Sequence, residues 1–553
     1  MWLFGAAAWA GPDTVLVSVD DVDHPPDVRA LGGRLVRCFR TSRVCLVEGG
    51  SPDALARLPG VRRAEPDGVM TLASGVSAEP TDDCPNPYEL ALTEVEGAWA
   101  AVCGLDAPTI AIQDAGFRAT HHDLAGQIAD QYDYGDGDPV AEVSQASGVP
   151  EHGTFIAGVA AAVANDAGRT GLAPGGSLFL QKIADQWGAL YYSYAIEAMD
   201  DLAANHPEVG VMNYSLASSS PPAAFTDAVE ALAAADVVVV AAAANCVFQP
   251  DCFDADNDLT PVFPASYPFA NVLAVASLRE GGGLDPWSHF GGESVDVAAP
   301  GTSLCSLGIG SDDQVSVSSG TSYAAPVAAG VAALVRERWP RLDAADTVDV
   351  LVRSCTPDPQ LADRVRCGGA LSADRALKVP VVRFDPPTDV DAAPSAELVL
   401  TGDSRAAGGE LFVQVTVPAG VTLDAAGGTS FAAGDSVPVP TGAEVADAPG
   451  VWLTVPLPED GPVELRLPVE AVATDSGLAA VRLVPSGAGG VGVDARFEVA
   501  ITSTAAEQEP PTPAPEQVTD GRVEPAGCGC GGGPRPVGWL VAAGVAAGRR
   551  RRR

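Results

Sequence analysis

Apolar and polar residues alternate along this chain in three different patterns, which change near residues 80 and 380. From about residue 81 to 379, short apolar runs alternate with stretches that repeat at helical spacing. The run at 237–241, VVVVA, is apolar on both faces, as is typical of a buried strand in a parallel sheet. Strands that alternate with helices in this way predict an α/β domain built on a parallel sheet.

The segments on either side of this domain have other patterns. Residues 11–80 contain an apolar run at 14–19, a hairpin pattern at 34–47 and a short helix after Ser51, which predicts a small α+β domain. Residues 380–503 consist of short alternating runs separated by Gly, Pro and Asp, which predicts an all-β sandwich. This last segment contains no His and no Cys, so we expect a binding or spacer role there.

One predicted helix is apolar on every side. Residues 323–335 are almost all Ala, Val, Leu and Gly, and a helix of this kind must be buried. Ser322 lies where this helix begins, and one interpretation is a simple cap on a core helix. A helix start also carries partial positive charge, so Ser322 could instead be a nucleophile held where developing negative charge is stabilised.

A serine nucleophile requires a base, which is usually a histidine. Among the six histidines, His152 is the one at a helix start bounded by glycine, in the stretch 151–158. An orienting carboxylate is also needed, and Asp114 follows the apolar run 109–113, at a strand end where α/β sheets build their sites. Asp114, His152 and Ser322 are therefore the candidate catalytic residues.

Around these three residues the chain resembles the subtilisin-like serine peptidases (subtilases, peptidase family S8), over about residues 80–378. The resemblance lies in separate blocks that follow one another in the family's order: 114–116 with 122–124, 152–158, 213–216, 243–245, 264–268, 288–291, 297–301 and 320–326. It implies a subtilisin-like three-layer domain over 81–379 that hydrolyses peptide bonds through an acyl-enzyme. The triad would be Asp114, His152 and Ser322, and the Asn245 side chain with the Ser322 backbone N–H would form the oxyanion hole.

The resemblance also implies a pocket for the side chain before the cut bond, with walls formed by Ser215, Leu216, Ala217, Ala243 and Ala244. Ala217 and Ala244 stand where the family usually has glycine, and Ala115 replaces a hydroxyl residue. The added methyl groups reduce the volume of the pocket, so we expect small or medium apolar side chains to be preferred.

No cofactor is expected for catalysis, but the family holds a structural calcium at places that match this chain. The matching residues are Asp123 and Asn165 through their side chains, and Ala167 and Arg169 through their backbone carbonyls. The loop 254–258, DADND, also has spaced carboxylates, although it lacks the glycine and final Glu of an EF-hand loop. A solvated acidic loop is an equal alternative there.

Residues 11–80 resemble the inhibitory propeptide of subtilases, through the sequences LPGV at 58–61 and EPD at 65–67. The resemblance implies a ferredoxin-like α+β unit that assists folding and then acts as an intramolecular inhibitor until it is cut. Residues 76–83 are small and acidic, as in an exposed processing loop, so we expect autoprocessing between about residues 70 and 84. An unrelated small domain is the alternative.

The composition of the chain indicates which binding partners and which cellular compartment to expect. The chain has 32 Lys and Arg against 72 Asp and Glu, a net charge of −40, so nucleic acid is not expected as a partner. Eleven cysteines and a short apolar, signal-like segment at residues 1–10 favour export. Local spacing suggests four disulfides and leaves Cys305 over; the expected pairs are Cys38–Cys45, Cys84–Cys103, Cys246–Cys252 and Cys355–Cys367.

The end of the chain carries a different signal. A linker rich in Pro, Glu and Thr at 504–526 leads to residues 527–553, which hold two cysteines, an apolar run and five arginines. This arrangement resembles the C-terminal sorting signals of some Gram-negative, especially myxobacterial, surface proteins, and it implies contact with a membrane. A disordered basic tail is the alternative. We expect an extracellular or cell-surface monomer.

Together these features predict a secreted or surface-anchored serine endopeptidase, made as an autoprocessed zymogen, that acts on proteins or peptides. A second function class stays open, in which the chain is a surface adhesin whose peptidase domain serves only its own maturation. An inactive relative is disfavoured because Asp114, His152, Ser322 and Asn245 are all present.

Overall fold

The computed structural model describes residues 14–378, apart from 73–75, 82–83, 85–86, 103, 105, 144–149, 166–167 and 247–254, together with the strands between 381 and 502. The expected signal-like segment at 1–10, the linker at 504–526 and the sorting segment at 527–553 lie outside the described residues. Among the helices that are described, none combines the length and apolar character needed to span a bilayer.

The N-terminal unit is a four-stranded antiparallel sheet in the order β2-β3-β1-β4. Its elements are β1 (Thr14–Val19), η1 (Arg29–Leu31), β2 (Arg34–Phe39), β3 (Val44–Glu48), α1 (Pro52–Leu55) and β4 (Val61–Pro66). Alternate residues of β1, including Val15 and Val17, pack with Val47 and Leu55 into a core of their own. The unit therefore has the α+β composition that its sequence pattern predicts.

The larger unit that follows is built on a nine-stranded sheet in the order β17-β18-β14-β13-β12-β10-β7-β9-β8. The neighbours pair in parallel except β17 and β18, which are antiparallel. The strands are β7 (Thr109–Asp114), β8 (Ile128–Asp133), β9 (Leu178–Lys182), β10 (Val209–Tyr214), β12 (Val238–Ala242), β13 (Val272–Leu278), β14 (Val297–Pro300), β17 (Thr356–Pro357) and β18 (Gly369–Ala370). This confirms the predicted α/β class with a parallel sheet.

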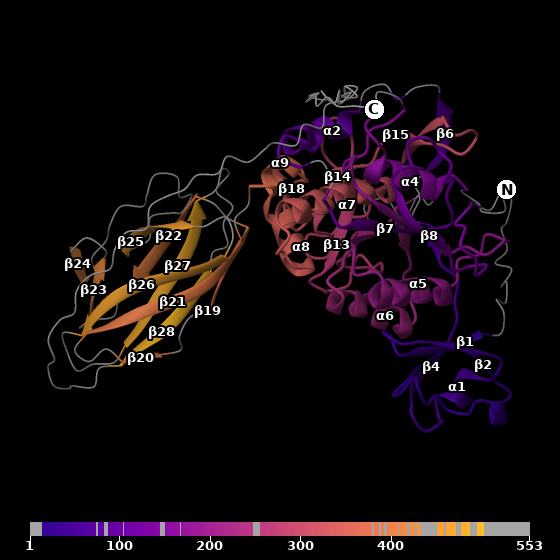
Figure 1. Ribbon diagram of the computed structural model, residues 1–553, viewed down its shortest axis with the longest axis horizontal. Helices are drawn as coiled ribbons and strands as arrows, with labels where there is room; N and C mark the ends of the chain where they lie inside the picture. The colour runs from indigo at the N-terminus through magenta and orange to yellow at the C-terminus, as the bar shows by residue number, and fades with distance from the viewer. Residues whose placement is uncertain are drawn as a thin grey trace, which may run out of the picture.

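Helices cover both faces of this sheet. The larger helices are α4 (His152–Ala161), α5 (Tyr192–Asn205), α6 (Ala223–Ala234), α7 (Thr321–Arg338) and α8 (Ala344–Arg353), and the short ones are α2 (Tyr88–Leu92), α3 (Val95–Ala98) and α9 (Ala373–Ala376). Successive residues of β12 enter different cores, since Val238 and Val240 pack with α4, α7 and α8, whereas Val239 and Ala241 pack with α5 and α6. The same arrangement of three layers is visible in Figure 1.

Helix α7 lies inside the molecule, as its apolar sequence predicts. Every residue from Thr321 to Val335 is buried, and the partly buried basic residues Arg336 and Arg338 lie in its last turn. Gly330 is needed where the helix approaches a neighbouring loop, because a Cβ there would lie 2.6 Å from the Leu172 Cβ. Burial of α7 places its first turn, with Ser322, in the middle of the domain.

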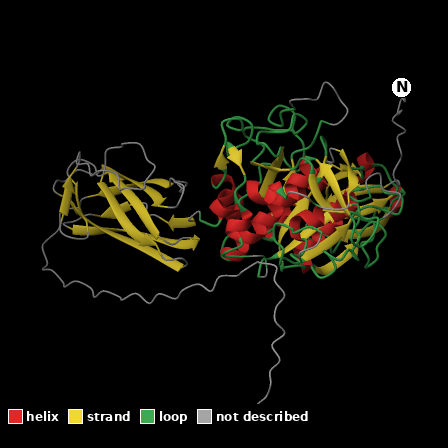
Figure 2. Cartoon of the chain, turned by 90° about the horizontal axis from the view of Figure 1, so that it is seen from above, coloured by secondary structure: helices red, strands yellow, loops and turns green. Residues whose placement is uncertain are grey.

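The region after residue 380 consists of strands in the part that the structure describes (Figure 2). One five-stranded sheet has the order β19-β21-β26-β23-β24 and the other the order β20-β28-β27-β22-β25. The strands are β19 (Val381–Asp385), β20 (Asp389–Asp391), β21 (Ser395–Ala406), β22 (Gly409–Thr416), β23 (Val421–Ala425), β24 (Thr429–Ala432), β25 (Val451–Leu457), β26 (Gly461–Ala471), β27 (Gly477–Ser486) and β28 (Ala495–Thr502). Two sheets of this kind agree with the predicted all-β class, while the boundaries at 380 and 503 stay predictions.

The disulfides agree with the sequence prediction in part. Cys38–Cys45 joins β2 to β3, and Cys355–Cys367 forms as expected. Cys246 is disulfide-bonded, and its expected partner Cys252 lies outside the described residues.

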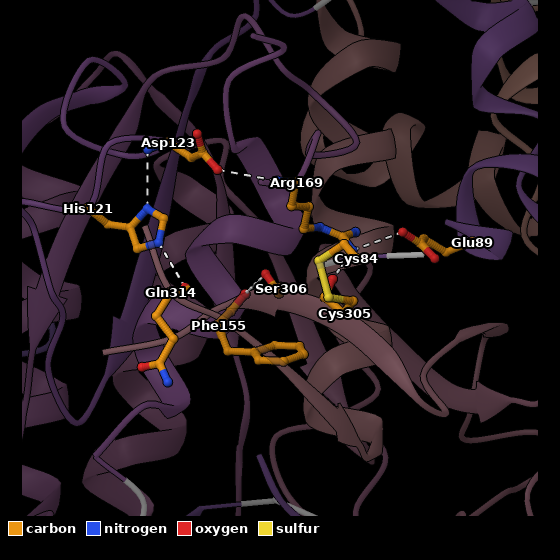
Figure 3. The surroundings of a disulfide bond; sticks show 9 residues. All are labelled: Cys84, Glu89, His121, Asp123, Phe155, Arg169, Cys305, Ser306 and Gln314. Atoms are coloured by element: carbon orange, nitrogen blue, oxygen red, sulfur yellow. Dashed lines mark hydrogen bonds and ion pairs between the residues drawn. A yellow bond between two sulfur atoms is a disulfide. The ribbon is translucent and has the colours of Figure 1, made fainter. Parts of the chain in front are cut away.

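The predicted pair Cys84–Cys103 is wrong, and so is the expectation that Cys305 is left over, because Cys84 is bonded to Cys305 (Figure 3). The reason is a small antiparallel sheet in the order β15-β16-β6, made of β15 (Leu304–Leu307), β16 (Val315–Ser319) and β6 (Val76–Thr81). It brings the chain around residue 84 next to β15, over a separation of 221 residues. Local spacing carries no signal for such a bond.

Candidate active site

Asp114 and His152 meet at the centre of the domain. Asp114 is the last residue of β7 and His152 the first of α4, and neither has any exposed surface. His152 Nδ1 lies 2.8 Å from Asp114 Oδ2 and 3.0 Å from Oδ1, and Oδ1 also accepts the Ala115 backbone N–H at 2.7 Å. A carboxylate on Nδ1 places the proton there and leaves Nε2 as the basic nitrogen.

Glycine next to His152 allows this close approach. A Cβ on Gly153 would lie 2.5 Å from the Gly116 carbonyl oxygen and 3.0 Å from the Asp114 Cβ. Helix α4 could therefore not begin against the end of β7 with any larger residue at position 153. The other nitrogen of the imidazole, His152 Nε2, is buried and has no hydrogen-bond partner among the residues that the structure describes.

Ser322 lies in the first turn of α7 and is also fully buried. Its hydroxyl donates to the carbonyl of Ser215 at 3.4 Å, and the Ser215 hydroxyl donates to the Ser322 carbonyl at 2.9 Å. The ring of the next residue, Tyr323, lies 5.5 Å from the His152 ring, so the first turns of α4 and α7 are neighbours. In this structure the Ser322 hydroxyl is thus bonded to Ser215 and not to His152.

Asn245 follows the end of β12 and reaches the same turn. Its Oδ1 accepts the backbone N–H of Thr321 at 2.9 Å, which fixes the orientation of the amide with its N–H₂ end on the opposite side. The preceding residue, Ala244, has a φ of +84°, a conformation that favours glycine. The observation explains why a glycine is usual at this place and shows that Ala244 carries backbone strain.

Asn257 and His289 hydrogen-bond to the backbone of Ala243 and Ala244, and neither residue is among the site residues predicted from the sequence. Asn257 Nδ2 donates to the Ala243 carbonyl at 2.9 Å, and Asn257 Oδ1 lies 2.9 Å from His289 Nδ1. The His289 backbone N–H in turn donates to the Ala244 carbonyl at 3.0 Å. Burial lowers the pKa of His289 from its usual 6.5, so the imidazole is kept neutral for this contact. In the sequence, Asn257 belongs to the acidic loop 254–258 and His289 to the block 288–291, and neither pattern predicts this contact.

In the part of that acidic loop that is described, the carboxylates accept backbone N–H groups, from within the loop and from residue 294. Asp256 Oδ1 accepts the Asp258 N–H at 2.9 Å, and Asp258 Oδ1 accepts the Ser294 N–H at 2.8 Å. Asp254 lies outside the described residues. Backbone N–H donors to such carboxylates are typical of a structural turn.

The segment that follows the N-terminal unit pairs with two strands, one directly after Ser215 and the other shortly before Ser322. Strand β5 (Thr71–Leu72) pairs antiparallel with β11 (Leu216–Ala217), which directly follows Ser215. Strand β6 pairs antiparallel with β16, which ends at Ser319, three residues before Ser322. Leu216 and Ala217, two of the residues predicted to form the specificity pocket, therefore lie beside a segment of the chain's own N-terminal part.

The N-terminal unit is bound to helices α5 and α6 by charged groups. The Glu65 carboxylate accepts the N–H groups of Ala223 (3.1 Å) and Ala224 (3.3 Å) at the start of α6. Asp67 Oδ1 accepts the Ser193 N–H at 3.0 Å at the start of α5. Carboxylates are favourable at both places because helix starts present unpaired N–H groups and positive charge.

Two ion pairs and one further carboxylate complete this interface. Arg37 pairs with Glu197 of α5, and Arg63 pairs with Asp227 of α6. Asp200 accepts the backbone N–H groups of Arg40 at 2.8 Å and Ser42 at 2.7 Å. The contact surface thus joins basic side chains of the N-terminal unit to acidic side chains of the larger one.

The residues expected to bind calcium come together in part, through hydrogen bonds to Asp123. Asn165 Nδ2 donates to Asp123 Oδ1 at 2.8 Å, and the Arg169 backbone N–H donates to Asp123 Oδ2 at 3.2 Å. Calcium requires converging oxygen atoms, whereas the contacts here are N–H donors to a carboxylate. Ala167 lies outside the described residues.

The side chain of Arg169 extends in another direction. Its guanidinium forms a buried ion pair with Glu89 at 2.9 Å and donates to the Cys305 carbonyl, next to the Cys84–Cys305 disulfide (Figure 3). A buried guanidinium in this position holds the segment that follows Cys84 against β15.

Comparison with known proteins agrees with this geometry. Residues 106–369 match the family model described as the Subtilase family (Peptidase S8). The chain is 32% identical over 285 residues to a thermophilic serine proteinase of Bacillus sp. (strain AK1), which covers 51% of this chain and 65% of that protein. It is 30% identical over 247 residues to subtilisin E of Bacillus subtilis (strain 168), with 45% of this chain and 60% of that protein covered.

A third relative is the halolysin-like extracellular serine protease Nep of Natrialba magadii, which is 32% identical over 292 residues, with 51% of this chain and 49% of that protein covered. The chain thus spans from about half to just under two thirds of the length of these curated relatives. Residues 106–369 thus resemble the Subtilase family in sequence and fold as three layers around a parallel sheet, and we call this matched part of the chain the subtilase domain.

Proposed function

We propose that the chain is a serine endopeptidase whose catalytic residues are Asp114, His152 and Ser322. The observation that carries the proposal is the fully buried pair His152 Nδ1–Asp114 Oδ2, 2.8 Å, with Nε2 left as a base close to the first turn of α7. Ser322 Oγ attacks the peptide carbonyl while Nε2 removes its proton. The same nitrogen then protonates the leaving amine, and water hydrolyses the acyl-enzyme by the reverse sequence.

The negative charge on the carbonyl oxygen needs donors that are already in place. In this proposal they are Asn245 Nδ2 and the backbone N–H of Ser322, in the first turn of α7. Support comes from the Thr321–Asn245 hydrogen bond of 2.9 Å, which holds the amide by its oxygen end. Donors held in this way stabilise the transition state without having to reorganise during the reaction.

We further propose that the N-terminal unit is an intramolecular inhibitor and that the chain cuts itself. Strands β5 and β6 flank residues 73–75 and pair with β11 and β16, the two strands that adjoin Ser215 and Ser322. A polypeptide that lies along both strands is oriented as a substrate would be. We expect the cut to fall between Leu72 and Val76, within the wider range 70–84 that the sequence predicts.

The test uses the full chain and its Ser322→Ala and His152→Ala variants. Wild type should release the N-terminal unit and hydrolyse an added peptide, and both variants should stay uncut with kcat lower by about 10⁴- to 10⁶-fold. Ser306→Ala is a matched control, because Ser306 is buried and donates to the Phe155 carbonyl at 2.8 Å, away from the triad. Equal processing in wild type and Ser322→Ala would show that another protease makes the cut.

The proposed site of action is outside the cell, at the surface of a Gram-negative bacterium or in the medium. Disulfides such as Cys38–Cys45 and Cys84–Cys305 persist in oxidising compartments, which supports export. Hydrolysis of added protein by the mature enzyme distinguishes a peptidase from the alternative, an adhesin that cuts only itself.

A further inference from the structure

Backbone pairing on two sides defines the place that Met70 occupies. The Met70 N–H donates to the Leu190 carbonyl at 2.8 Å, and Val69 pairs with Tyr191 in an antiparallel bridge. Two residues later, Leu72 pairs with Leu216 of β11. The segment 69–72 therefore lies as an added strand between two backbone edges of the subtilase domain.

Successive side chains of an extended segment point in opposite directions, and here they separate clearly. Val69 is 51% exposed, whereas Met70 is 5% exposed. Met70 packs in a cluster with Leu190, Tyr192, Tyr214 and Leu216. The pocket formed by these four residues, which we call the Met70 pocket, thus belongs to the subtilase domain while its occupant belongs to the N-terminal segment.

The floor of the Met70 pocket contains a buried polar atom. The hydroxyl of Tyr214 donates to the Met70 sulfur at 2.9 Å, and Tyr214 itself is 1% exposed. Within the described part of the chain, this sulfur is the one hydrogen-bond partner of the hydroxyl. A buried hydroxyl without a partner is unfavourable, so the pocket distinguishes an occupant with an acceptor from one without.

Tyr214 is also adjacent in sequence to a hydrogen-bond partner of the proposed nucleophile. It is the last residue of β10 and precedes Ser215, whose carbonyl accepts the Ser322 hydroxyl. Beyond Ser215 lies β11, the strand that pairs with β5. A substrate that replaces the segment 69–72 along the same edges would place one side chain in the Met70 pocket.

We propose that Tyr214 is a specificity-determining residue, and that it selects methionine over apolar side chains of the same size at the substrate position that Met70 occupies. The inference rests on the proposed peptidase function and deepens it. A thioether sulfur is a weak acceptor, whereas norleucine has nearly the same shape with a methylene group in its place. Shape alone discriminates weakly among long apolar side chains, so the hydroxyl supplies the selectivity.

The experiment compares two quenched fluorescent peptides with the sequence of residues 66–78, one with Met70 and one with norleucine at that position. The mature wild-type enzyme should cleave the methionine peptide with a kcat/KM about 2- to 10-fold higher, the range expected for one hydrogen bond. In Tyr214→Phe this ratio should fall to about one, with cleavage of the norleucine peptide retained.

Tyr192→Phe is the matched control, because Tyr192 lines the same pocket but its hydroxyl makes no hydrogen bond to Met70 in the described structure. It should keep the ratio of wild type. Equal rates for the two peptides in wild type, or an unchanged ratio in Tyr214→Phe, would overturn the specificity role of Tyr214 and leave the proposed peptidase function intact. Failure of wild type to cleave either peptide faster than Ser322→Ala would overturn the peptidase function and the assignment with it.

Discussion

The side-chain oxygen of Asn245 and the backbone N–H of Thr321 form a hydrogen bond of 2.9 Å, although they lie 76 residues apart in the chain. The bond turns the N–H₂ group of Asn245 into the position of an oxyanion donor in the proposed mechanism. We therefore expect Asn245→Ala to lower kcat by about 10²- to 10³-fold with little change in KM. Steady-state kinetics on a peptide substrate measure both constants.

A matched control for this variant is Asn271→Ala. Asn271 is also buried and donates to the Val237 carbonyl at 3.0 Å, at the opposite end of β12. Its loss should lower the thermal unfolding midpoint but leave kcat of the folded enzyme unchanged. A kcat for Asn245→Ala equal to that of wild type would exclude Asn245 as the oxyanion donor.

Replacement of Ala244 by glycine should stabilise the folded protein. Its φ of +84° is strained for alanine, so Ala244→Gly should raise the free energy of unfolding by about 1 kcal/mol after the higher chain entropy of glycine is subtracted. The missing methyl also enlarges the predicted specificity pocket, which should shift the preference before the cut bond towards Phe and Tyr. Thermal unfolding and a peptide library measure the two effects. Ala217→Gly, in strand β11, should enlarge the pocket without any gain in stability.

The uncut chain should lose stability as the pH rises towards neutrality, in part through Glu197. Burial, with the charges of Asp201 and Asp200, raises the pKa of this carboxyl from 4.5 to about 7, although Arg37 acts in the opposite direction. The folded chain thus binds this proton more tightly than the unfolded chain does. The stabilisation is fully present below pH 4.5 and is lost as the pH rises through about 7.

Thermal unfolding of uncut Ser322→Ala between pH 4 and 8 tests this, with Glu197→Gln added as the variant. Glu197→Gln should reduce the loss of thermal stability between pH 4 and 8. Glu230→Gln, at an exposed position of α6, should leave this loss unchanged. A decline of the same size with Gln at 197 would assign the effect to other carboxylates.

Removal of calcium should not affect the fold. Both oxygens of Asp123 already accept N–H groups, from Asn165 and Arg169, so no cation is needed to neutralise this carboxylate. We expect EDTA to leave the thermal unfolding midpoint of the full chain unchanged. We expect Asp123→Asn to lower it to the same extent with and without EDTA. A fall with EDTA that added calcium reverses would show that the ion is bound.

Local patterns were sufficient for several parts of this protein. The buried run at 237–241 and the all-apolar helix after Ser322 predict their own burial, because each pattern is complete within a few residues. The candidate residues Asp114, His152 and Ser322 could be chosen for the same reason, since each lies in a short motif at the end of a predicted element. The pair Cys38–Cys45 is close in sequence and spans a hairpin, so it too could be predicted.

Other features depend on which strands become neighbours, and that is decided by the whole sheet. The Cys84–Cys305 bond joins residues 221 positions apart, because β6 pairs with β16 and so extends the sheet that β16 forms with β15. The support of Ala243 by Asn257 and His289 needs loops from after β12 and after β13 to meet. The acidic loop 254–258 and the block 288–291 can be recognised in the sequence, but no local pattern shows that they meet.

The amino-acid sequence by itself determined the elements of this protein, their burial and the identity of the candidate catalytic residues, because periodicity and motif spacing act over short distances. The tertiary structure alone decided where the Ser322 hydroxyl points, which side chain fills the Met70 pocket and which donors meet Asp123. Tyr214 and Met70 are 144 residues apart, and their contact exists only because the N-terminal segment pairs with β11, a strand far along the chain.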